Sequence, residues 1–265
     1  MSKVFGFRGL AAVALTVAAF STQAAELMPD FSLVPTGWTT DRYDPDSFSN
    51  VGTFQGRNNV LGIGISSDQS SANRGGQSSN FYSTQGKQHL ISGGAGSSIS
   101  ADLFIDASWA DSANGHVRSD MWGIMSDAVP DVSAYPIIGF TNYGGAARYR
   151  VYDGNTSNGW VDSTVAVAFG AWTSFEIAFT GSTFDFLING VTVYSDSTID
   201  GTTGFSGVIM QAYNFDDPTI NGRIVEDYTA HWSNANANAV PEPGSLALVG
   251  LGLVGLVSLR RRKAI

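Results

Sequence analysis

Between its two ends the chain alternates short apolar runs with polar breaks, and no stretch of 12 residues there shows a clear helical apolar period. Alternating runs separated by Gly, Asn, Asp and Ser clusters are typical of strands and turns. Many short strands at this spacing predict an all-β sandwich or barrel. The predicted strands are Asn59 to Ser66, Asn80 to Thr84, His89 to Ser92, Ser98 to Asp106, Asp120 to Met125, Ile137 to Asn142, Arg148 to Tyr152, Trp172 to Thr180, Val208 to Tyr213 and Arg223 to Trp232.

The stretch from Trp172 to Ser195 carries the clearest pattern, because its turns fix a register. Gly181-Ser182 is a two-residue turn that sets Thr180 opposite Thr183, and Asn189-Gly190 is a strong signal for a second turn. A slip of one residue would turn the apolar set outward, so we predict a three-stranded meander with one buried side. The predicted pairs are Phe179 with Phe184, Ile177 with Phe186, Phe175 with Ile188, Ile188 with Val191 and Phe186 with Val193.

The segment from Glu26 to about Asn50 is broken by Pro and Gly and holds scattered large apolar residues. We expect Phe31, Leu33 and Trp38 to lie against the body as an edge strand or a lid.

The N-terminus has the three parts of a secretory signal peptide. Lys3 and Arg8 are followed by an apolar run and then by small residues. Thr22-Gln23-Ala24 predicts cleavage after Ala24, with cleavage after Ala25 as the alternative. Residues 1–25 are therefore set apart from the fold.

The C-terminus has three blocks in order. They are Val240-Pro241-Glu242-Pro243, an uncharged apolar run from Ser245 to Leu259, and the basic cluster Arg260-Arg261-Arg262-Lys263. As a helix, the 15-residue run would span about 22 Å, short of the ~30 Å hydrocarbon core. The basic cluster favours the cytoplasmic side. The pattern alone predicts a short single transmembrane helix, so an ordinary membrane anchor is one interpretation.

These blocks resemble the PEP-CTERM sorting signal of Gram-negative bacteria. The resemblance implies an exported precursor held in the inner membrane until an exosortase processes it. The implied partners are the exosortase and, transiently, the inner membrane. The implied destination is the cell envelope surface or the extracellular matrix.

Composition limits what the middle of the chain does. Between the two targeting segments remain eight of the 14 basic residues and 22 of the 23 acidic ones, a net charge of about −14. A nucleic-acid-binding surface needs clustered Lys and Arg, so this balance argues against nucleic acid as a partner. There is no cysteine, which excludes disulfides and Cys/His zinc sites.

A second resemblance covers the predicted strands from Asn59 to Ser233. It is carried by Arg148 to Gly154, Trp160, Gly170 to Ile177 and Phe186 to Val191, a strand opening on Trp before a hairpin that ends in Asn-Gly. These residues resemble concanavalin A-like, laminin-G-type domains, which implies an antiparallel jelly-roll β-sandwich. The predicted layout is a signal peptide over 1–25, a sandwich over 26–232 with its core from about 59, a flexible linker over 233–239, and the sorting tail over 240–265 with its membrane segment at 245–259.

Polar and aromatic residues alternate on two predicted strands in a way that suits sugar binding. Arg148, Arg150 and Tyr152 share one side of their strand, and Gln211 and Tyr213 share one side of theirs, opposite the apolar positions. If the strands belong to one sheet, the five residues form a carbohydrate-binding groove. The alternative is an ordinary polar outer face.

Other chemistry has weaker support in the sequence. A glycosidase needs two placed carboxylates, yet the middle of the chain has three glutamates (Glu26, Glu176 and Glu226) and no Glu-x-Asp-x-x-Glu motif of the laminarinase-like relatives. We therefore predict no catalytic residues. Acidic loops offer oxygen ligands for calcium, with solvated loops as the alternative. The calcium candidates are Asp106, Asp111, Asp120, Asp216 and Asp217.

Three hypotheses follow for the function. The preferred one is an exported, exosortase-processed protein whose lectin-like sandwich binds carbohydrate or matrix without catalysis. The second is a polysaccharide-degrading hydrolase or lyase. The third is a structural matrix protein with no discrete ligand site.

Overall fold

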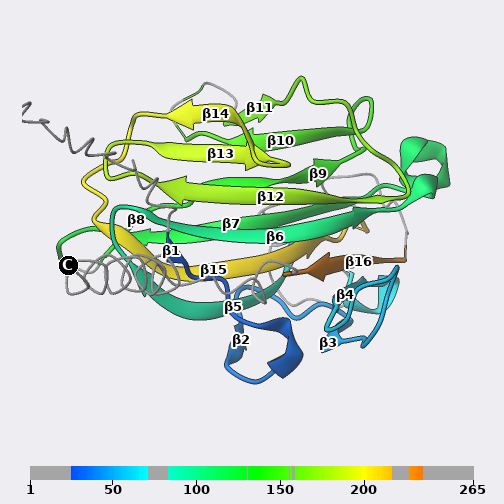
Figure 1. Ribbon diagram of the computed structural model, residues 1–265. Helices are drawn as coiled ribbons and strands as arrows, with labels where there is room; N and C mark the ends of the chain where they lie inside the picture. Colours follow the sequence, from blue (N-terminus) through cyan, green and yellow to red (C-terminus); the bar gives the residue numbers. More distant parts are fainter. Residues whose placement is uncertain are drawn as a thin grey trace, which may run out of the picture.

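A computed structural model describes residues 25–70, 83–129, 131–154, 156, 159–216 and 227–234. They form two eight-stranded sheets, which Figure 1 shows stacked as layers, with β12 and β6 of one sheet in front of β9 and β7 of the other. All pairings between strands are antiparallel except the short one between β1 and β6. The predicted all-β antiparallel jelly-roll sandwich is confirmed.

Sheet A holds the predicted meander at one side. Its main path is β14 (Val191–Asp196), β13 (Phe184–Ile188), β12 (Ala171–Phe179), β6 (Ser97–Ile105), β16 (Tyr228–Ser233), β4 (Leu61–Ile65) and β3 (Ser47–Asn50), with β1 (Ala25–Glu26) beside β6.

Sheet B holds both strands predicted to carry the sugar-binding groove. Its main path is β11 (Trp160–Asp162), β10 (Arg148–Tyr152), β9 (Ile137–Thr141), β7 (Arg118–Ser126), β15 (Gly204–Tyr213), β5 (Thr84–Gly93) and β2 (Trp38–Thr40), with β8 (Val132–Ala134) beside β7. Short 3-10 helices occupy some connections: η1 (Phe31–Leu33), η2 (Ser67–Gln69), η4 (Ala107–Ala110) and η5 (Ser112–Asn114).

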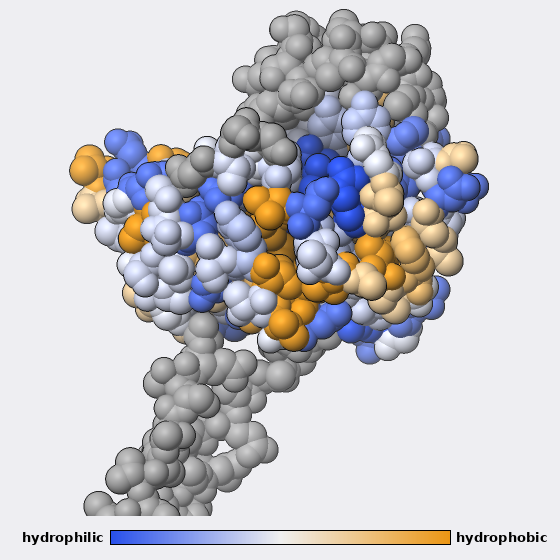
Figure 2. Space-filling view, turned by 90° about the horizontal axis from the view of Figure 1, so that it is seen from above, coloured by the Kyte–Doolittle hydropathy of each residue, from blue (hydrophilic) through white to orange (hydrophobic). Residues whose placement is uncertain are grey.

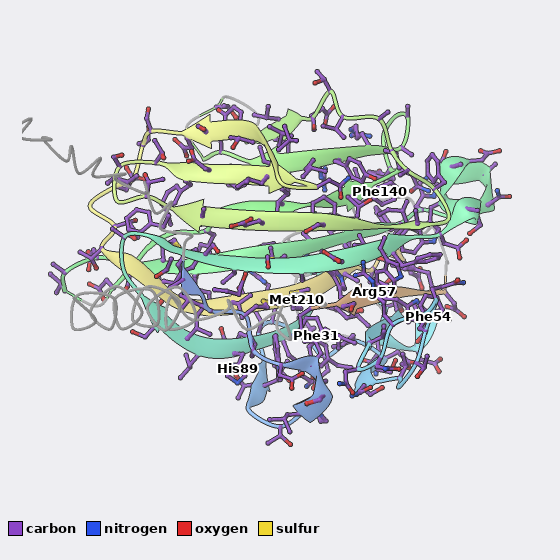
Figure 3. All side chains as sticks on the ribbon, viewed as in Figure 1. Phe31, Phe54, Arg57, His89, Phe140 and Met210 are labelled. Atoms are coloured by element: carbon purple, nitrogen blue, oxygen red, sulfur yellow. The ribbon has the colours of Figure 1, made fainter. Side chains whose placement is uncertain are left out.

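The core lies between the sheets and is built from alternate residues of their strands. Phe140 of sheet B and the buried Phe and Ile residues of β12 and β13 belong to one hydrophobic cluster. Phe140 and Met210 are labelled in the side-chain view of Figure 3. The indole N–H of Trp232 in sheet A donates a hydrogen bond to the hydroxyl of Ser119 in sheet B at 2.9 Å. Figure 2, which views the molecule from the side of β11 and β14, shows a band of apolar residues between polar areas.

The predicted hairpin register is confirmed at four of its five pairs. Phe179 pairs with Phe184, and the other β12–β13 pairs and the turn pair Ile188–Val191 follow as predicted. The fifth is wrong, because a β-bulge between Phe186 and Leu187 sets Phe186 opposite Tyr194 instead of Val193. A bulge inserts one extra residue in one strand and shifts every later pair by one.

Other predictions need smaller corrections. β5 runs unbroken through Thr84–Gly93, so the predicted break before His89 is wrong. Trp38 lies buried on the edge strand β2 and Phe31 is buried in η1, as expected, but Leu33 is 65% exposed.

The first and last described strands lie near the predicted domain boundaries, which themselves stay a prediction. Ala25 starts β1, and its backbone N–H donates to the carbonyl of Gly96. Ser233, placed in the linker by sequence, is the last residue of β16 and pairs with Asp102. The side-chain amide of Asn234 then donates to the carbonyl of Pro29 at 2.8 Å.

Candidate binding cavity on sheet B

The structure brings all five predicted groove residues to the outward face of sheet B. On β10 the core-facing residues are Tyr149 and Val151, so Arg148, Arg150 and Tyr152 face away from the core. On β15 the core-facing residues are Met210 and Ala212, and Gln211 and Tyr213 face the same way as the β10 set. β9 and β7 lie between these two strands.

The strand register arranges the outward side chains in rows across the sheet. The middle row pairs Gln211 with Asp120, Asp120 with Gly139 and Gly139 with Arg150. A neighbouring row pairs Ile209 with Trp122, Trp122 with Ile137, Ile137 with Tyr152 and Tyr152 with Trp160. The two rows therefore set a polar line of residues beside an apolar and aromatic one.

A cavity of about 420 Å³ opens over these rows. Arg150, Tyr152 and Tyr213 line it, whereas Arg148 and Gln211 of the predicted set lie beside it. Its remaining lining includes side chains that the sequence analysis did not assign to the groove: Arg118, Trp122, Tyr135, Ile137, Tyr143, Trp160 and Phe215. The alternation of Arg118, Asp120 and Trp122 on β7 repeats the pattern of β10 and could have pointed to this strand.

An ion pair and a glutamine form a hydrogen-bonded triplet in the floor of the cavity. The Nε of Arg118 and the side-chain amide of Gln211 both donate to Oδ2 of Asp120, at 2.6 and 2.8 Å. Asp120 is fully buried, and the absent side chain of Gly139 leaves it room, because a Cβ there would lie 2.4 Å from Oδ1. Asp120 therefore neutralises Arg118 within the floor.

Two arginines of this face, Arg118 and Arg42, make cation–π contacts with aromatic rings. The guanidinium of Arg118 lies 4.8 Å from the ring centroid of Trp160 and 5.2 Å from that of Tyr213. Arg42, which forms an ion pair with Asp41, lies 4.5 Å above Trp122. Burial lowers the pKa of Arg42.

Arg148 is fixed at the rim. Its Nε donates to Oδ1 of Asp162 at 2.9 Å, and its Nη1 donates to the carbonyls of Tyr143 and Ala146. The guanidinium of Arg148 is therefore paired with a carboxylate at the rim.

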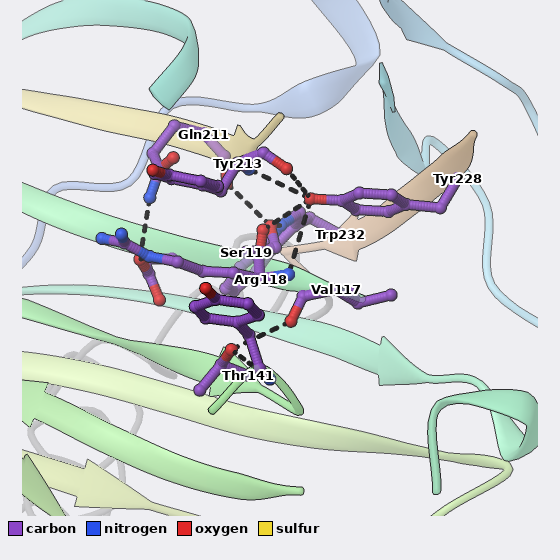
Figure 4. Close-up of polar contacts among 10 residues, drawn as sticks. Val117, Arg118, Ser119, Thr141, Gln211, Tyr213, Tyr228 and Trp232 are labelled. Carbon is purple, nitrogen blue, oxygen red and sulfur yellow. Dashed lines mark hydrogen bonds and ion pairs between the residues drawn. The ribbon is translucent and has the colours of Figure 1, made fainter. Parts of the chain in front are cut away.

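The side chain of Tyr228 in sheet A forms hydrogen bonds with the backbone of two cavity residues of sheet B (Figure 4). Its hydroxyl lies 2.7 Å from the carbonyl of Tyr213 and 2.8 Å from that of Arg118, and it accepts from the backbone N–H of Tyr213 at 3.0 Å. Burial raises the pKa of this phenol. One side chain thus joins the ends of β7 and β15 at two cavity residues.

The predicted calcium ligands that the structure describes lie in separate places and contact different groups. Asp106 caps η4 by accepting from the backbone N–H of Ser108, and Asp111 caps η5 in the same way. Asp120 lies in the cavity floor and Asp216 is buried just after β15, while Asp217 lies outside the described residues. Among the residues that the structure describes, no group of three or more His, Cys, Asp or Glu side chains could hold a metal ion. Calcium binding stays a prediction.

The two described glutamates lie in sheet A, away from the cavity. Glu176 pairs across strands with Ser100, whose hydroxyl donates to Glu26 at 2.6 Å. Burial raises the pKa of Glu26, and the nearby Glu176 carboxylate adds to this. Glu226 lies outside the described residues.

A second cavity, of about 490 Å³, lies beside η4 and η5 at sheet A. The ring of His231 in its wall stacks on that of Phe54, with centroids 3.8 Å apart and planes 8° apart. Burial lowers the pKa of His231, against the opposing effect of Asp106.

The family comparison settles the meaning of the C-terminal blocks. Residues 239–263 match the PEP-CTERM protein-sorting motif. The chain carries a PEP-CTERM sorting signal. This match contains every residue predicted for the signal: Val240, Pro241, Glu242, Pro243, Arg260, Arg261 and Arg262.

The PEP-CTERM motif implies a secreted exosortase substrate that transits the membrane. The motif itself lies outside the described residues. Among the residues that are described, no helix has the length and apolar character needed to cross a membrane.

Several solved structures are similar to this chain at low sequence identity. A sialidase matches at 11% identity and a TM-score of 0.47, over 80% of this chain and 18% of its own. The β-glucanase of Bacillus licheniformis matches at 13% and 0.45, over 77% of this chain and 93% of its own. A glycoside hydrolase family 16 endo-glucanase from Bacteroides ovatus gives the same two values over 77% and 97%. No curated protein matches the sequence.

Proposed function

We propose that this exported PEP-CTERM protein binds a polysaccharide of the cell envelope or extracellular matrix of a Gram-negative bacterium, and does not cleave it. The observation that carries the proposal is the aromatic cavity on sheet B. At about 420 Å³ it lies within the range of about 300–1,000 Å³ of typical ligand pockets, and such pockets combine apolar walls with a few placed polar groups.

The lining suits a sugar ring. Trp160, Tyr152 and Tyr213 offer flat faces that cover the apolar C–H surface of a sugar, and aromatic side chains do this at low cost in conformational entropy. Arg150 and the aromatic hydroxyl groups at the cavity supply hydrogen bonds for sugar oxygens.

The carboxylates near the cavity are engaged in ways that favour binding over hydrolysis. Glycoside hydrolysis uses a pair of carboxyl groups facing the scissile bond, about 5–9.5 Å apart. Asp120 is buried beneath the cavity and bound to Arg118 and Gln211, and Asp162 is bound to Arg148 at the rim. Neither side chain is among those that line the cavity.

The test uses the full-length chain in a non-ionic detergent and a panel of neutral and acidic polysaccharides. Affinity electrophoresis, with and without calcium, measures retardation by each polymer. We expect retardation by at least one polymer, and at least tenfold weaker binding for Trp160→Ala. The matched control is Trp172→Ala, since Trp172 lies in sheet A beneath another arginine, Arg57.

Each alternative function predicts a different result. Release of reducing ends or of unsaturated sugar ends from a bound polymer would show a hydrolase or a lyase. Retardation by no polymer in the panel would contradict the proposal and favour a structural matrix protein. Equal loss in Trp160→Ala and Trp172→Ala would place binding elsewhere than the cavity.

The proposed location has its own test. Replacing Pro241, Glu242 and Pro243 together by alanine removes the Pro-Glu-Pro block of the sorting signal and leaves the apolar run and the basic cluster intact. We expect the precursor to accumulate in the inner membrane, as in cells without exosortase. Cell fractionation followed by immunoblotting measures this, and normal arrival of the variant at the surface would contradict it.

A further inference from the structure

Arg150 is the one arginine of the cavity region that has no carboxylate partner among the described residues. Arg118 is paired with Asp120, Arg148 with Asp162, and Arg42 with Asp41. Arg150 is only 9% exposed, and its buried Nε has no hydrogen-bond acceptor. Its guanidinium makes a cation–π contact with Trp160, with 3.8 Å between the guanidinium carbon and the centroid of the ring.

The buried guanidinium of Arg150 destabilises the folded state of the ligand-free protein. Burial, with added repulsion from Arg118 and Arg148 and against the attraction of Asp120 and Asp162, lowers the pKa of Arg150 to about 9. The side chain therefore stays cationic at neutral pH, in a place that little water reaches and where the nearest carboxylates, Asp120 and Asp162, are hydrogen-bonded to other arginines. A buried charge is normally paired, since an uncompensated one destabilises the folded state.

The geometry matches a carboxylate ligand. A guanidinium has a planar fork of N–H donors that binds a carboxylate through two parallel hydrogen bonds. Trp160 covers one flat face of the Arg150 guanidinium, and Nε is buried, so the edge formed by the two Nη groups is the one left to donate to a ligand at the cavity. The rings of Tyr152 and Trp160 stand beside it, where the rest of a sugar ring would lie.

The charge distribution of the whole chain points the same way. The region between the targeting segments has a net charge of about −14, which repels an acidic polymer in general. Nevertheless, four of its eight basic residues gather on this one face: Arg42, Arg118, Arg148 and Arg150. Three of these four are paired with a carboxylate, so Arg150 is the described cation of this face that remains to attract an acidic sugar.

We propose that the cavity on sheet B selects a polysaccharide with carboxylated sugars, such as uronic acids, and that Arg150 binds the carboxylate. This inference rests on the proposed polysaccharide binding and specifies its ligand class. Removal of the carboxylate from the ligand and removal of the guanidinium from the protein must then have the same effect.

The experiment compares a polymer with its own neutral form. Polygalacturonate, alginate and hyaluronate are each tested beside the same polymer after chemical reduction of its carboxyl groups, using the full-length chain in detergent. Titration calorimetry measures affinity for wild type, Arg150→Gln and Arg150→Lys. Arg57→Gln is the matched control, because Arg57 also lies over a tryptophan, Trp172 at 4.4 Å, but on sheet A.

We expect at least one acidic polymer to bind at least tenfold more tightly than its reduced form, since a hydrogen-bonded charge pair is lost on reduction. Arg150→Gln should remove this preference, and Arg150→Lys should restore part of it because a lysine keeps the charge but not the fork. Arg57→Gln should keep wild-type preference. Thermal unfolding of each variant verifies that it is folded.

The outcomes separate this inference from the proposed function. Equal binding of acidic and reduced polymers, lost in Trp160→Ala, would overturn the carboxylate inference and leave the polysaccharide cavity in place. A preference for acidic polymers that survives in Arg150→Gln would overturn the assignment to Arg150. Binding of none of the acidic or neutral polymers would overturn both.

Discussion

The hydroxyl of Tyr228 accepts a hydrogen bond from the backbone N–H of Tyr213 at 3.0 Å, so a side chain of sheet A holds a cavity residue of sheet B (Figure 4). The same hydroxyl lies within hydrogen-bond distance of the carbonyls of Tyr213 and Arg118, and its single proton satisfies one of them at a time. These backbone groups lie just beyond the last ladder pair between β7 and β15, Ala212 with Ser119. Tyr228 thus takes the place of a further strand-to-strand pair.

Tyr228→Phe should lower the free energy of unfolding by about 1–3 kcal/mol, because it leaves buried backbone groups without a partner. Chemical denaturation measures the change. Tyr135→Phe is the control, since Tyr135 is 41% exposed and its hydroxyl has no hydrogen bond to the described residues. Similar stability of both variants would contradict a structural role for the Tyr228 hydroxyl.

Arg150→Met should raise the free energy of unfolding of the ligand-free protein by about 1 kcal/mol or more, because it replaces an unpaired buried cation with an apolar chain. Arg57→Met should lower it, because Arg57 forms an ion pair with Asp102 and its loss leaves that carboxylate unpaired. Chemical denaturation at neutral pH compares the two variants. A destabilised Arg150→Met protein would show that Arg150 serves the fold instead of a ligand.

His231 should make the protein less stable in mild acid. Its pKa is lowered in the folded state by burial, so the unfolded chain binds a proton first as the pH falls below about 6.5. Stability is therefore lost from there down to the folded-state pKa, by less than about 1.4 kcal/mol per pH unit for one proton. Denaturation between pH 7 and 5 should show a shallower loss for His231→Gln than for wild type.

A second variant checks the cause of the His231 effect. Phe54→Ala keeps the imidazole but uncovers the ring that Phe54 stacks on. Because the shift comes from burial, this variant should also lose stability less steeply with acid. An unchanged pH dependence in both variants would rule out His231 as its source.

The Asn189-Gly190 turn offers a test of local backbone conformation. Gly190 has φ of 75°, and open space surrounds the position that a Cβ would take, so Gly190→Ala adds backbone strain without a clash. The unfolding free energy should fall by about 1–2 kcal/mol. Gly94→Ala is the matched control, because Gly94 does not have a positive φ, and it should be neutral or slightly stabilising. Equal effects at both positions would contradict this explanation.

The sequence predicted those parts of the fold that depend on local pattern. The alternation in Arg148 to Tyr152 gave the bounds of β10 and the side that each residue faces, and the two turns gave most of the meander register. The predicted pair Phe186–Val193 is wrong because the prediction assumed an unbroken register, whereas a bulge shifts the pairing by one residue.

The binding cavity was predictable only in part. Period-two alternation selected Arg150, Tyr152 and Tyr213, but the order β10, β9, β7, β15 depends on pairings between distant segments. Without that order, Arg118 and Trp122 of β7 could not be placed between the two predicted strands. The unpaired state of Arg150 is likewise a property of the tertiary structure, since Asp120 and Asp162 both lie in its row and bind other arginines.

β15 and β16 come last among the described strands, so neither sheet can complete its strand pairing until the end of the domain is available. β15 lies between β7 and β5, and β16 lies between β6 and β4, so both are interior strands. In a chain exported from its N-terminus, sheet B would therefore keep unpaired strand edges until β15 emerges, and sheet A until β16 emerges. β16 ends at Ser233, 12 residues before the apolar run that starts at Ser245. Closure of sheet A and arrival of the sorting signal at the membrane are therefore separated by the export of only a short piece of chain.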